Sequence, residues 1–263
     1  MAHIRASFLP LFFAAFALGA FAPGLRTVNG DGAWAADISK TKHNLSAGGP
    51  GVIKATSVTQ VCSFCHTPHL ASGTPLWNQS LSKATYTVPS SKVWRTLKST
   101  PQNTPDGDSR LCLSCHDGTV AIASVVNLGG TVTTKSMQGV GRLLTAEGKL
   151  SENSPSFLGT DLSGHHPVSI GVNDSLVKDK GQQCDDEEVS WRICVPRAPV
   201  RLRPTENAYK IGANTKLGVQ CTSCHDPHDD PVPGTTKFLR DGTPSDTSPL
   251  CSRCHVPCSQ LCP

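Results

Sequence analysis

Four copies of one short pattern constrain how this chain can fold more than any other feature. The pattern is Cys-x-x-Cys-His, and we call its copies the first to fourth motif in chain order. They occupy residues 62–66, 112–116, 221–225 and 251–255. This pattern is typical of the covalent attachment of a c-type haem, in which both thiols bond the porphyrin and the imidazole binds the iron. The sequence therefore predicts four haem c groups, one on each motif.

The residues predicted to hold these haems follow directly from the motifs. The eight attachment cysteines are Cys62, Cys65, Cys112, Cys115, Cys221, Cys224, Cys251 and Cys254. The histidines on the near side of each iron are His66, His116, His225 and His255. Zinc is the alternative, but zinc ribbons pair their cysteine units about 15 to 20 residues apart and need no following histidine. Here successive motifs begin 50, 109 and 30 residues apart, and histidine follows every pair.

The composition predicts a fold with little regular structure. Aromatic residues make up 5% of the chain, which also contains 23 glycines and 20 prolines. Such a chain buries too little apolar surface of its own to offset the entropy lost on folding. Four haems would supply the missing core. We therefore expect a multihaem cytochrome c fold, mostly irregular coil with short helices at the motifs, wrapped around a row of four haems.

Residues 1–35 are typical of a secretory signal peptide. Arg5 precedes an apolar stretch at residues 8–22, and Ala33-Trp34-Ala35 provides small residues for cleavage. An uncleaved membrane anchor is the alternative, although the stretch is interrupted by proline and glycine and is shorter than the roughly 20 residues of a span. Residues 36–263 then form one tetrahaem domain without a membrane span. We expect it to be exported to the cell surface or the outside, or alternatively to the periplasm.

The histidines outside the motifs are candidates for the distal ligand, which binds each iron on the side opposite the motif histidine. Of 10 histidines, His3 leaves with the signal peptide and five lie outside the motifs. We predict that the four distal ligands are His43, His69, His166 and His228, with His165 as the alternative to His166. Met137 is the only methionine of the mature chain, so histidine–methionine ligation is open to one haem at most. The economical interpretation is four bis-histidine haems.

Two of these histidines lie in a repeated context. His69 and His228 come three residues after the histidine of the first and third motifs. They therefore emerge on the same side of the haem as the motif's own histidine and cannot reach its far face. Each can bind a different haem packed alongside, which would hold two irons close together. A solvent-exposed histidine on a turn is the alternative for each.

Four cysteines lie outside the motifs, namely Cys184, Cys194, Cys258 and Cys262. In an exported protein such cysteines are expected in disulfides. We expect Cys184 to pair with Cys194 and Cys258 with Cys262, because each pair closes a short loop. Pairing between the two groups, free thiols and a metal site of four thiolates remain open alternatives.

Several stretches of the chain resemble a known family. These stretches are residues 42–46, 61–69, 75–78, 111–122, 166–169 and 221–228. Together they resemble the exported multihaem cytochromes of metal-reducing bacteria, and among them the OmcE type, a tetrahaem cytochrome that polymerises into extracellular filaments. The resemblance spans roughly residues 40–255. Two stretches depart from it, the charged insert at 181–208 and the tail at 256–263.

The supply of distal histidines favours an electron-transfer protein over an enzyme, because every iron can be closed on both sides. The resemblance implies a head-to-tail homopolymer in which one distal histidine is donated across the subunit boundary. His69 is the expected donor, and His43 is the alternative. Other redox cytochromes or an extracellular electron acceptor would be the partners, and no basic patch with interleaved aromatics indicates nucleic acid. The alternative functions are a periplasmic tetrahaem shuttle and a multihaem reductase of a small substrate such as nitrite.

Overall fold

The structure is a computed structural model. It describes residues 37–68, 76–90, 101–126, 136–172, 191–205, 210–211, 215–230 and 236–262. All of them belong to one contact unit, Trp34–Pro263. The predicted signal peptide, His69 and Cys184 lie outside the described residues, so what concerns them stays a prediction.

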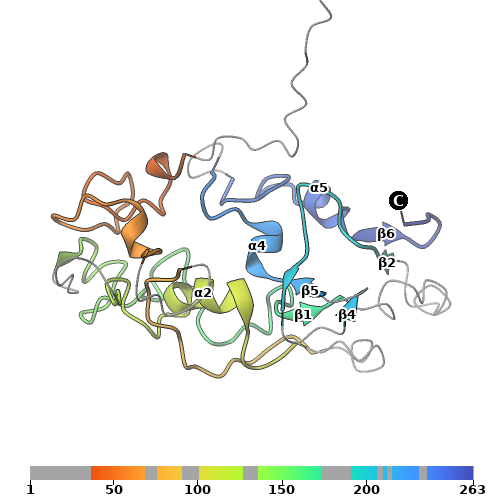
Figure 1. Cartoon of the computed structure of the whole chain (residues 1–263), viewed down its shortest axis with the longest axis horizontal. Coiled ribbons are helices and arrows are strands. Elements are labelled where there is room, and N and C mark those ends of the chain that lie inside the picture. Colours follow the sequence, from red (N-terminus) through yellow and green to blue (C-terminus); the bar gives the residue numbers. More distant parts are fainter. Residues whose placement is uncertain are drawn as a thin grey trace, which may run out of the picture. The chain divides into compact units, whose positions relative to one another are not determined.

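Helices are short and gather at the four motifs (Figure 1). η2 (Cys62–Phe64) and α4 (Cys221–Cys224) lie inside the first and third motifs, α2 (Gly107–His116) ends on the second, and α5 (Ser248–Cys251) leads into the fourth. A further turn, η1 (Ile38–Lys40), precedes the first motif. Most of the described chain is coil. The prediction of irregular structure with short helices at the motifs is confirmed.

α2 is the longest of the described helices, with 10 residues. It begins at Gly107, whose φ of +49° is a conformation that glycine adopts without strain. Its buried Leu113 packs against Tyr86 and Leu162 and so fixes the helix on the rest of the unit. Among the described residues, no helix combines the length and the apolar character that crossing a membrane requires.

A small antiparallel sheet, which the sequence analysis did not predict, precedes the third motif. β5 (Thr215–Val219) pairs with β1 (Ile170–Gly171), β3 (Arg203–Pro204) and β4 (Lys210–Ile211). The close pairing depends on Gly218 in β5, because a Cβ there would lie 2.6 Å from Thr205 Cγ2 and would also meet the carbonyl of Ile170. β5 ends two residues before α4, so the sheet fixes where the third motif begins.

A second antiparallel pair lies at the fourth motif. β2 (Trp191–Ile193) pairs with β6 (His255–Pro257), and Ile193 lies opposite His255. β2 belongs to the charged insert at 181–208. The described part of this insert is therefore docked on the fourth motif and on the sheet around β5, rather than being an isolated surface loop.

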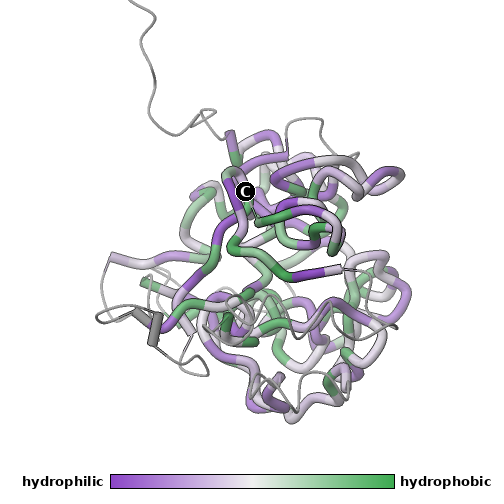
Figure 2. The backbone as a smooth tube through the Cα atoms, turned by 90° about the vertical axis from the view of Figure 1, so that its right-hand side faces the viewer, coloured by the Kyte–Doolittle hydropathy of each residue, from purple (hydrophilic) through white to green (hydrophobic). Residues whose placement is uncertain are grey.

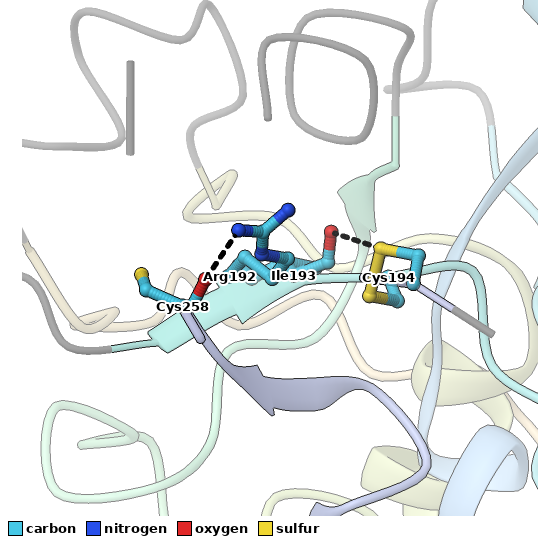
Figure 3. The surroundings of a disulfide bond; sticks show 5 residues. Arg192, Ile193, Cys194 and Cys258 are labelled. Atoms are coloured by element: carbon cyan, nitrogen blue, oxygen red, sulfur yellow. Dashed lines mark hydrogen bonds between the residues drawn. A yellow bond between two sulfur atoms is a disulfide. The ribbon is translucent and has the colours of Figure 1, made fainter. Parts of the chain in front are cut away.

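The expected pairing of the extra cysteines is wrong. Cys194 forms a disulfide with Cys262, with a Cα–Cα distance of 5.5 Å (Figure 3). Cys258 is also disulfide-bonded. The β2–β6 pairing is the physical reason, because it brings the insert and the C-terminal tail side by side, and Arg192 Nη2 donates a hydrogen bond to Cys258 O at 2.6 Å. The two groups of cysteines are thus cross-linked to each other.

The apolar core consists of three small clusters. The largest contains Ala55, Phe64, Ile122, Ala123, Met137, Leu144 and Leu150. Tyr86, Leu113 and Leu162 form the second, and Val172 is the centre of the third. Figure 2 shows that apolar and polar stretches alternate over short distances along the chain. This agrees with the small core that the composition predicts.

Candidate functional site

Short helical turns present the cysteines of the first three motifs. Residues three apart on such a turn are neighbours, which brings the two thiols of one motif to the same side. None of the eight motif cysteines takes part in a disulfide. Burial raises the pKa of Cys65, Cys224 and Cys254 to about 11, so these thiols are protonated at neutral pH.

Within the described ranges, no group of three or more His, Cys, Asp or Glu side chains could hold a bare metal ion. Each motif provides two thiols and one adjacent histidine, which is the arrangement that fits covalent attachment of a porphyrin.

Cysteines of successive motifs lie next to one another. The pKa of Cys112, in the second motif, is raised because its thiol donates a hydrogen bond to Cys221 in the third. After desolvation by burial, repulsion from Cys65 of the first motif is the next cause that raises the pKa of Cys115. For Cys224, the causes that raise the pKa after burial are repulsion from Cys221 of its own motif and then from Cys251 of the fourth motif. Cysteines of the first and second, the second and third, and the third and fourth motifs are thus close enough to interact electrostatically.

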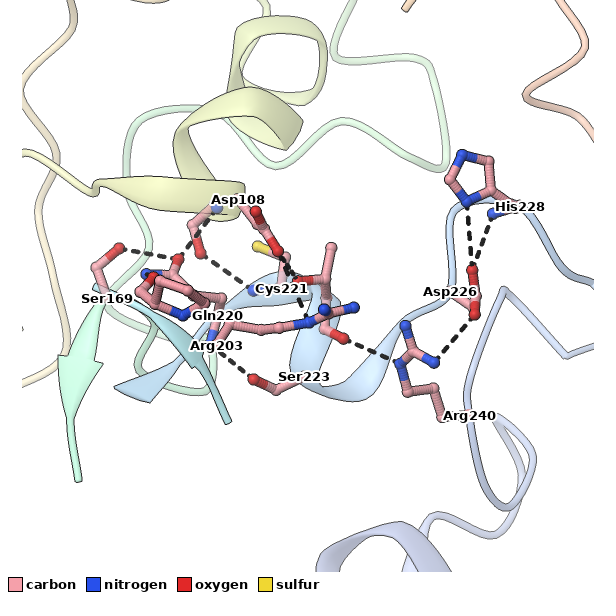
Figure 4. Close-up of polar contacts among 12 residues, drawn as sticks. Asp108, Ser169, Arg203, Gln220, Cys221, Ser223, Asp226, His228 and Arg240 are labelled. Carbon is pink, nitrogen blue, oxygen red and sulfur yellow. Dashed lines mark hydrogen bonds and ion pairs between the residues drawn. The ribbon is translucent and has the colours of Figure 1, made fainter. Parts of the chain in front are cut away.

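Gln220 holds the second and third motifs together (Figure 4). It is 1% exposed, its Oε1 accepts a hydrogen bond from Ser109 N of α2 at 3.1 Å, and its Nε2 donates to Asp106 Oδ1 at 2.8 Å. Ser109 Oγ in turn accepts a hydrogen bond from Cys221 N at 3.0 Å. Gln220 precedes α4, so these bonds position the start of one motif on the helix that carries another.

Three histidine pairs have the separation expected for two ligands of one metal ion. His43 and His116 have ring centres 6.1 Å apart, His66 and His228 6.1 Å, and His166 and His255 6.3 Å. An imidazole nitrogen lies about 2 Å from a bound metal and its ring centre about 1 Å farther, so two opposed ligands have ring centres about 6 Å apart. Each pair joins a motif histidine to one of the predicted distal histidines.

Hydrogen bonds leave the Nε2 atoms of three of these rings, and of His225, available to a metal. Nδ1 bonds to a backbone carbonyl oxygen in His43 (Pro227 O, 2.9 Å), His116 (Ser156 O, 2.8 Å), His166 (Pro167 O, 2.9 Å) and His225 (Lys237 O, 3.0 Å). Metal-bound histidines almost always donate their other ring N–H in this way, which fixes the tautomer and the ring orientation. Burial also lowers the pKa of His43 to about 4, so the ring is neutral at physiological pH.

The turn after the third motif reaches three of the histidine sites. It follows His225 directly, its Pro227 O accepts the hydrogen bond from His43, and its His228 lies opposite His66. Asp226 opens the turn. Contact with His228 and with Arg240 lowers the pKa of Asp226 to about 2.

Two strained residues serve the same region. Lys237 and Phe238 have φ values of +49° and +62°, a conformation that bulky residues rarely adopt. The Lys237 carbonyl accepts the bond from His225, and the Phe238 ring stacks on His43 with ring centres 4.3 Å apart. Backbone strain is often retained where it positions functional groups. Here it orients the histidine of the third motif and His43, one of the predicted distal ligands.

The remaining predicted ligands are placed as follows. His166, rather than its neighbour His165, lies opposite His255. Met137 is 4% exposed and packs in the largest apolar cluster. The described residues place no ring opposite His225, and His69 lies outside them.

Sequence reasoning missed the groups that orient the rings. The carbonyls of Pro227, Ser156 and Lys237 carry no residue-specific signal, because any residue offers a carbonyl. Asp226 had a signal that was not used, since it follows the histidine of its motif as Asp117 does in the second motif.

Comparison with known protein families supports the chemistry of the site. Residues 214–259 match the family described as the doubled CXXCH motif. This stretch contains the third and fourth motifs and their cross-contacts. The paired motif binds haem covalently. It indicates a multihaem c-type cytochrome and, with it, haem-based electron transfer. No curated protein matches the chain.

Proposed function

We propose that this protein transfers electrons through four covalently bound haems, one on each motif, with an imidazole on both sides of each iron. Bound haem iron cycles between its ferric and ferrous states, which is the chemistry that the cofactor supplies. The protein's part is to fix the spacing of the cofactors and tune their potentials. The observation that carries the proposal is the set of three histidine pairs with ring centres 6.1 to 6.3 Å apart.

The pairs suggest which distal histidine serves which motif. His228 serves the first motif, His43 the second and His166 the fourth. His228 belongs to the turn of the third motif, so the ligand of one motif is supplied by another. The contacts between cysteines of successive motifs support cofactors that lie close enough to exchange electrons in a row.

The third motif is the candidate receiver of a ligand from another copy of the chain. We predicted that His69 is donated across a subunit boundary. The ring centre of His228 lies 6.1 Å from that of His66, which makes His228 the candidate distal ligand of the first motif from the same chain. His225 is then the iron ligand left for His69, either from the same chain or from the next one. Donation from the next chain would give an open head-to-tail polymer, an extracellular filament for electron export.

Export of the protein is supported by its disulfide. Cys194–Cys262 joins residues 68 apart, and such bonds persist in oxidising compartments. The predicted signal peptide agrees with this location. A periplasmic shuttle has the same chemistry and differs only in assembly.

An enzymatic function is less well supported, because a reductase would need an iron with one open side. At three motifs a predicted distal histidine has its ring centre 6.1 to 6.3 Å from that of the motif histidine, which supports closed irons there. The third motif is where such an opening would have to be sought.

The first experiment counts haems and their ligands. Mass spectrometry and a pyridine haemochrome assay of the mature protein should give four haems per chain, and electron paramagnetic resonance should give only low-spin iron. His166→Ala should open one iron, whereas the matched variant His165→Ala should leave the spectrum unchanged. Three or fewer haems, or a high-spin signal in the intact protein, would overturn the tetrahaem bis-histidine proposal.

The second experiment tests assembly. His69→Ala should give one five-coordinate haem, and added imidazole should restore the low-spin spectrum. If His69 joins two copies, the variant should be monomeric by electron microscopy and should stay monomeric after imidazole is added. Filaments that persist in His69→Ala would refute the role of His69 in joining subunits. A wild-type protein that is monomeric at high concentration would leave the periplasmic shuttle as the remaining function.

A further inference from the structure

The Nδ1 atoms of five histidines described above differ in the kind of group that they contact. In His43, His116, His166 and His225, Nδ1 bonds to a neutral backbone carbonyl. In His228, Nδ1 instead lies 3.7 Å from the carboxylate oxygen Oδ1 of Asp226 (Figure 4).

Other contacts hold Asp226 in this position. Its Oδ2 lies 3.0 Å from Arg240 Nη1, and its Oδ1 accepts a hydrogen bond from His228 N at 3.2 Å. The Arg240 side chain is 6% exposed, and its Nε donates to Thr222 O at 2.9 Å inside α4. The carboxylate is therefore anchored on both sides, with one oxygen toward the cation and the other toward the imidazole.

A carboxylate beside a ligating imidazole changes what that imidazole does to a metal. An imidazole that binds through Nε2 carries its proton on Nδ1, and an anion next to this proton makes the ring a stronger electron donor. Stronger donation stabilises the oxidised iron and lowers the reduction potential, and hydrogen bonding around the axial ligand is one of the recognised means of tuning haem. A neutral carbonyl has the same effect to a smaller degree.

We propose that Asp226 is a positioning residue that lowers the reduction potential of the haem on the first motif by acting through His228. The inference rests on the proposed function, in which His228 and His66 hold one iron. Asp226 belongs to the turn of the third motif, so one motif sets the potential of another. In the equivalent turn after the first motif, Thr67 takes the place of Asp226.

The test is Asp226→Asn in the haem-loaded protein, studied by spectroelectrochemical titration and electron paramagnetic resonance. One reduction potential should rise while the others stay nearly constant. We expect about a tenfold change in the ratio of reduced to oxidised iron, which is 59 mV for a one-electron couple. The g values of one low-spin haem should change as well, because its ligand field weakens.

Asp241→Asn is the matched control. Asp241 Oδ2 bonds to Arg253 Nη2 of the fourth motif at 2.6 Å, so the variant also removes an acid beside a motif arginine. It should leave the g values at their wild-type positions. Equal changes in both variants would mean that any nearby acid has this effect, and the inference would be wrong.

His228→Ala separates failure of the inference from failure of the proposed function. If His228→Ala leaves every iron six-coordinate, His228 is not a ligand and the proposed ligation fails. If it opens one iron, that haem must be the one whose potential rises in Asp226→Asn. Asp226→Thr, which copies the first motif, gives the same readout where the asparagine variant matures poorly. Unchanged potentials and g values in these Asp226 variants, with His228 proven as a ligand, would overturn the inference alone.

Discussion

The turns that follow the second and third motifs begin with the same residue type and use it differently. Asp117 and Asp226 each come directly after the histidine of their motif. Asp117 is 3% exposed, and its carboxylate accepts hydrogen bonds from neutral donors. These donors are Ser82 Oγ at 2.6 Å, Tyr86 Oη at 2.6 Å, and Thr119 N and Oγ1 at 2.8 Å each.

Asp226 has a different environment. Its side chain is 28% exposed, and its contacts are a cation, Arg240, and the imidazole of His228. A buried carboxylate that gathers several neutral donors holds separate segments together, because each donor would otherwise be buried without a partner. A half-exposed carboxylate beside a metal ligand can act on the potential instead. The position directly after a motif therefore does not decide the role of an aspartate. The residues that surround its carboxylate decide it.

The largest expected effect is on stability, and it should separate the two acids. Asp117→Asn should lower the free energy of unfolding by about 3 kcal/mol, because an amide cannot accept from all of these donors. Asp226→Asn should lower it by about 1 kcal/mol, since the amide oxygen can still accept from Arg240. Guanidinium unfolding of the haem-loaded variants, followed by circular dichroism, measures both. Equal losses would remove the distinction between the two turns.

A smaller effect is expected from one donor of the Asp117 network. Tyr86→Phe removes the hydroxyl that donates to Asp117 Oδ2 and to Ser82 Oγ. It should lower the free energy of unfolding by about 1 to 2 kcal/mol, because the ring still packs against Leu113. In a background of Asp117→Asn the same substitution should cost clearly less. Additive losses in this double-mutant cycle would show that the two side chains do not act as a unit.

The same network predicts a dependence on alkaline pH. Burial, and then the hydrogen bond to Asp117, raise the pKa of Tyr86 well above its ordinary value. A raised folded-state pKa gives stability that is present below the unfolded-state pKa of about 10 and is lost as the pH rises through the folded-state value. The wild-type protein should therefore be more stable than Tyr86→Phe below pH 10, and this difference in the free energy of unfolding should shrink as the pH rises above 10. A constant difference between the two proteins across this range would contradict the assignment.

How far the sequence could predict the site depends on what each feature is made of. The motifs, and the choice of His43, His166 and His228 as candidate ligands, followed from residue types that can be counted. The pairing of His228 with His66 did not follow, because it depends on how the turn after the third motif folds back on the first. The carbonyl acceptors could not be predicted either, since they are backbone groups.

The fold shows the same division. Low aromatic content and the many glycines and prolines predict coil with short helices at the motifs, and that description holds. The sheet around β5 was missed because β1, β3 and β4 have only two residues each, too few for an alternating pattern. The disulfide pairing was wrong because proximity in sequence was taken as proximity in space, whereas the β2–β6 pairing decides it.

The smallest expected effect is on how salt changes the two acids. The Debye length falls from about 30 Å at 0.01 M salt to about 3 Å at 1 M, so salt weakens exposed charges more than buried ones. The stability difference between wild type and Asp117→Asn should therefore change little over this range, because that carboxylate is buried.

The shift in reduction potential caused by Asp226→Asn should become smaller at 1 M salt without disappearing. Salt screens the field of the Asp226 carboxylate in the solvent, but it does not remove the effect of this carboxylate on the His228 ring, which lies 3.7 Å away. Titrations at both salt concentrations measure this, with Asp241→Asn as the control. A shift that vanishes at 1 M salt would mean that Asp226 acts only as a surface charge, and the contrast with Asp117 would then be one of exposure alone.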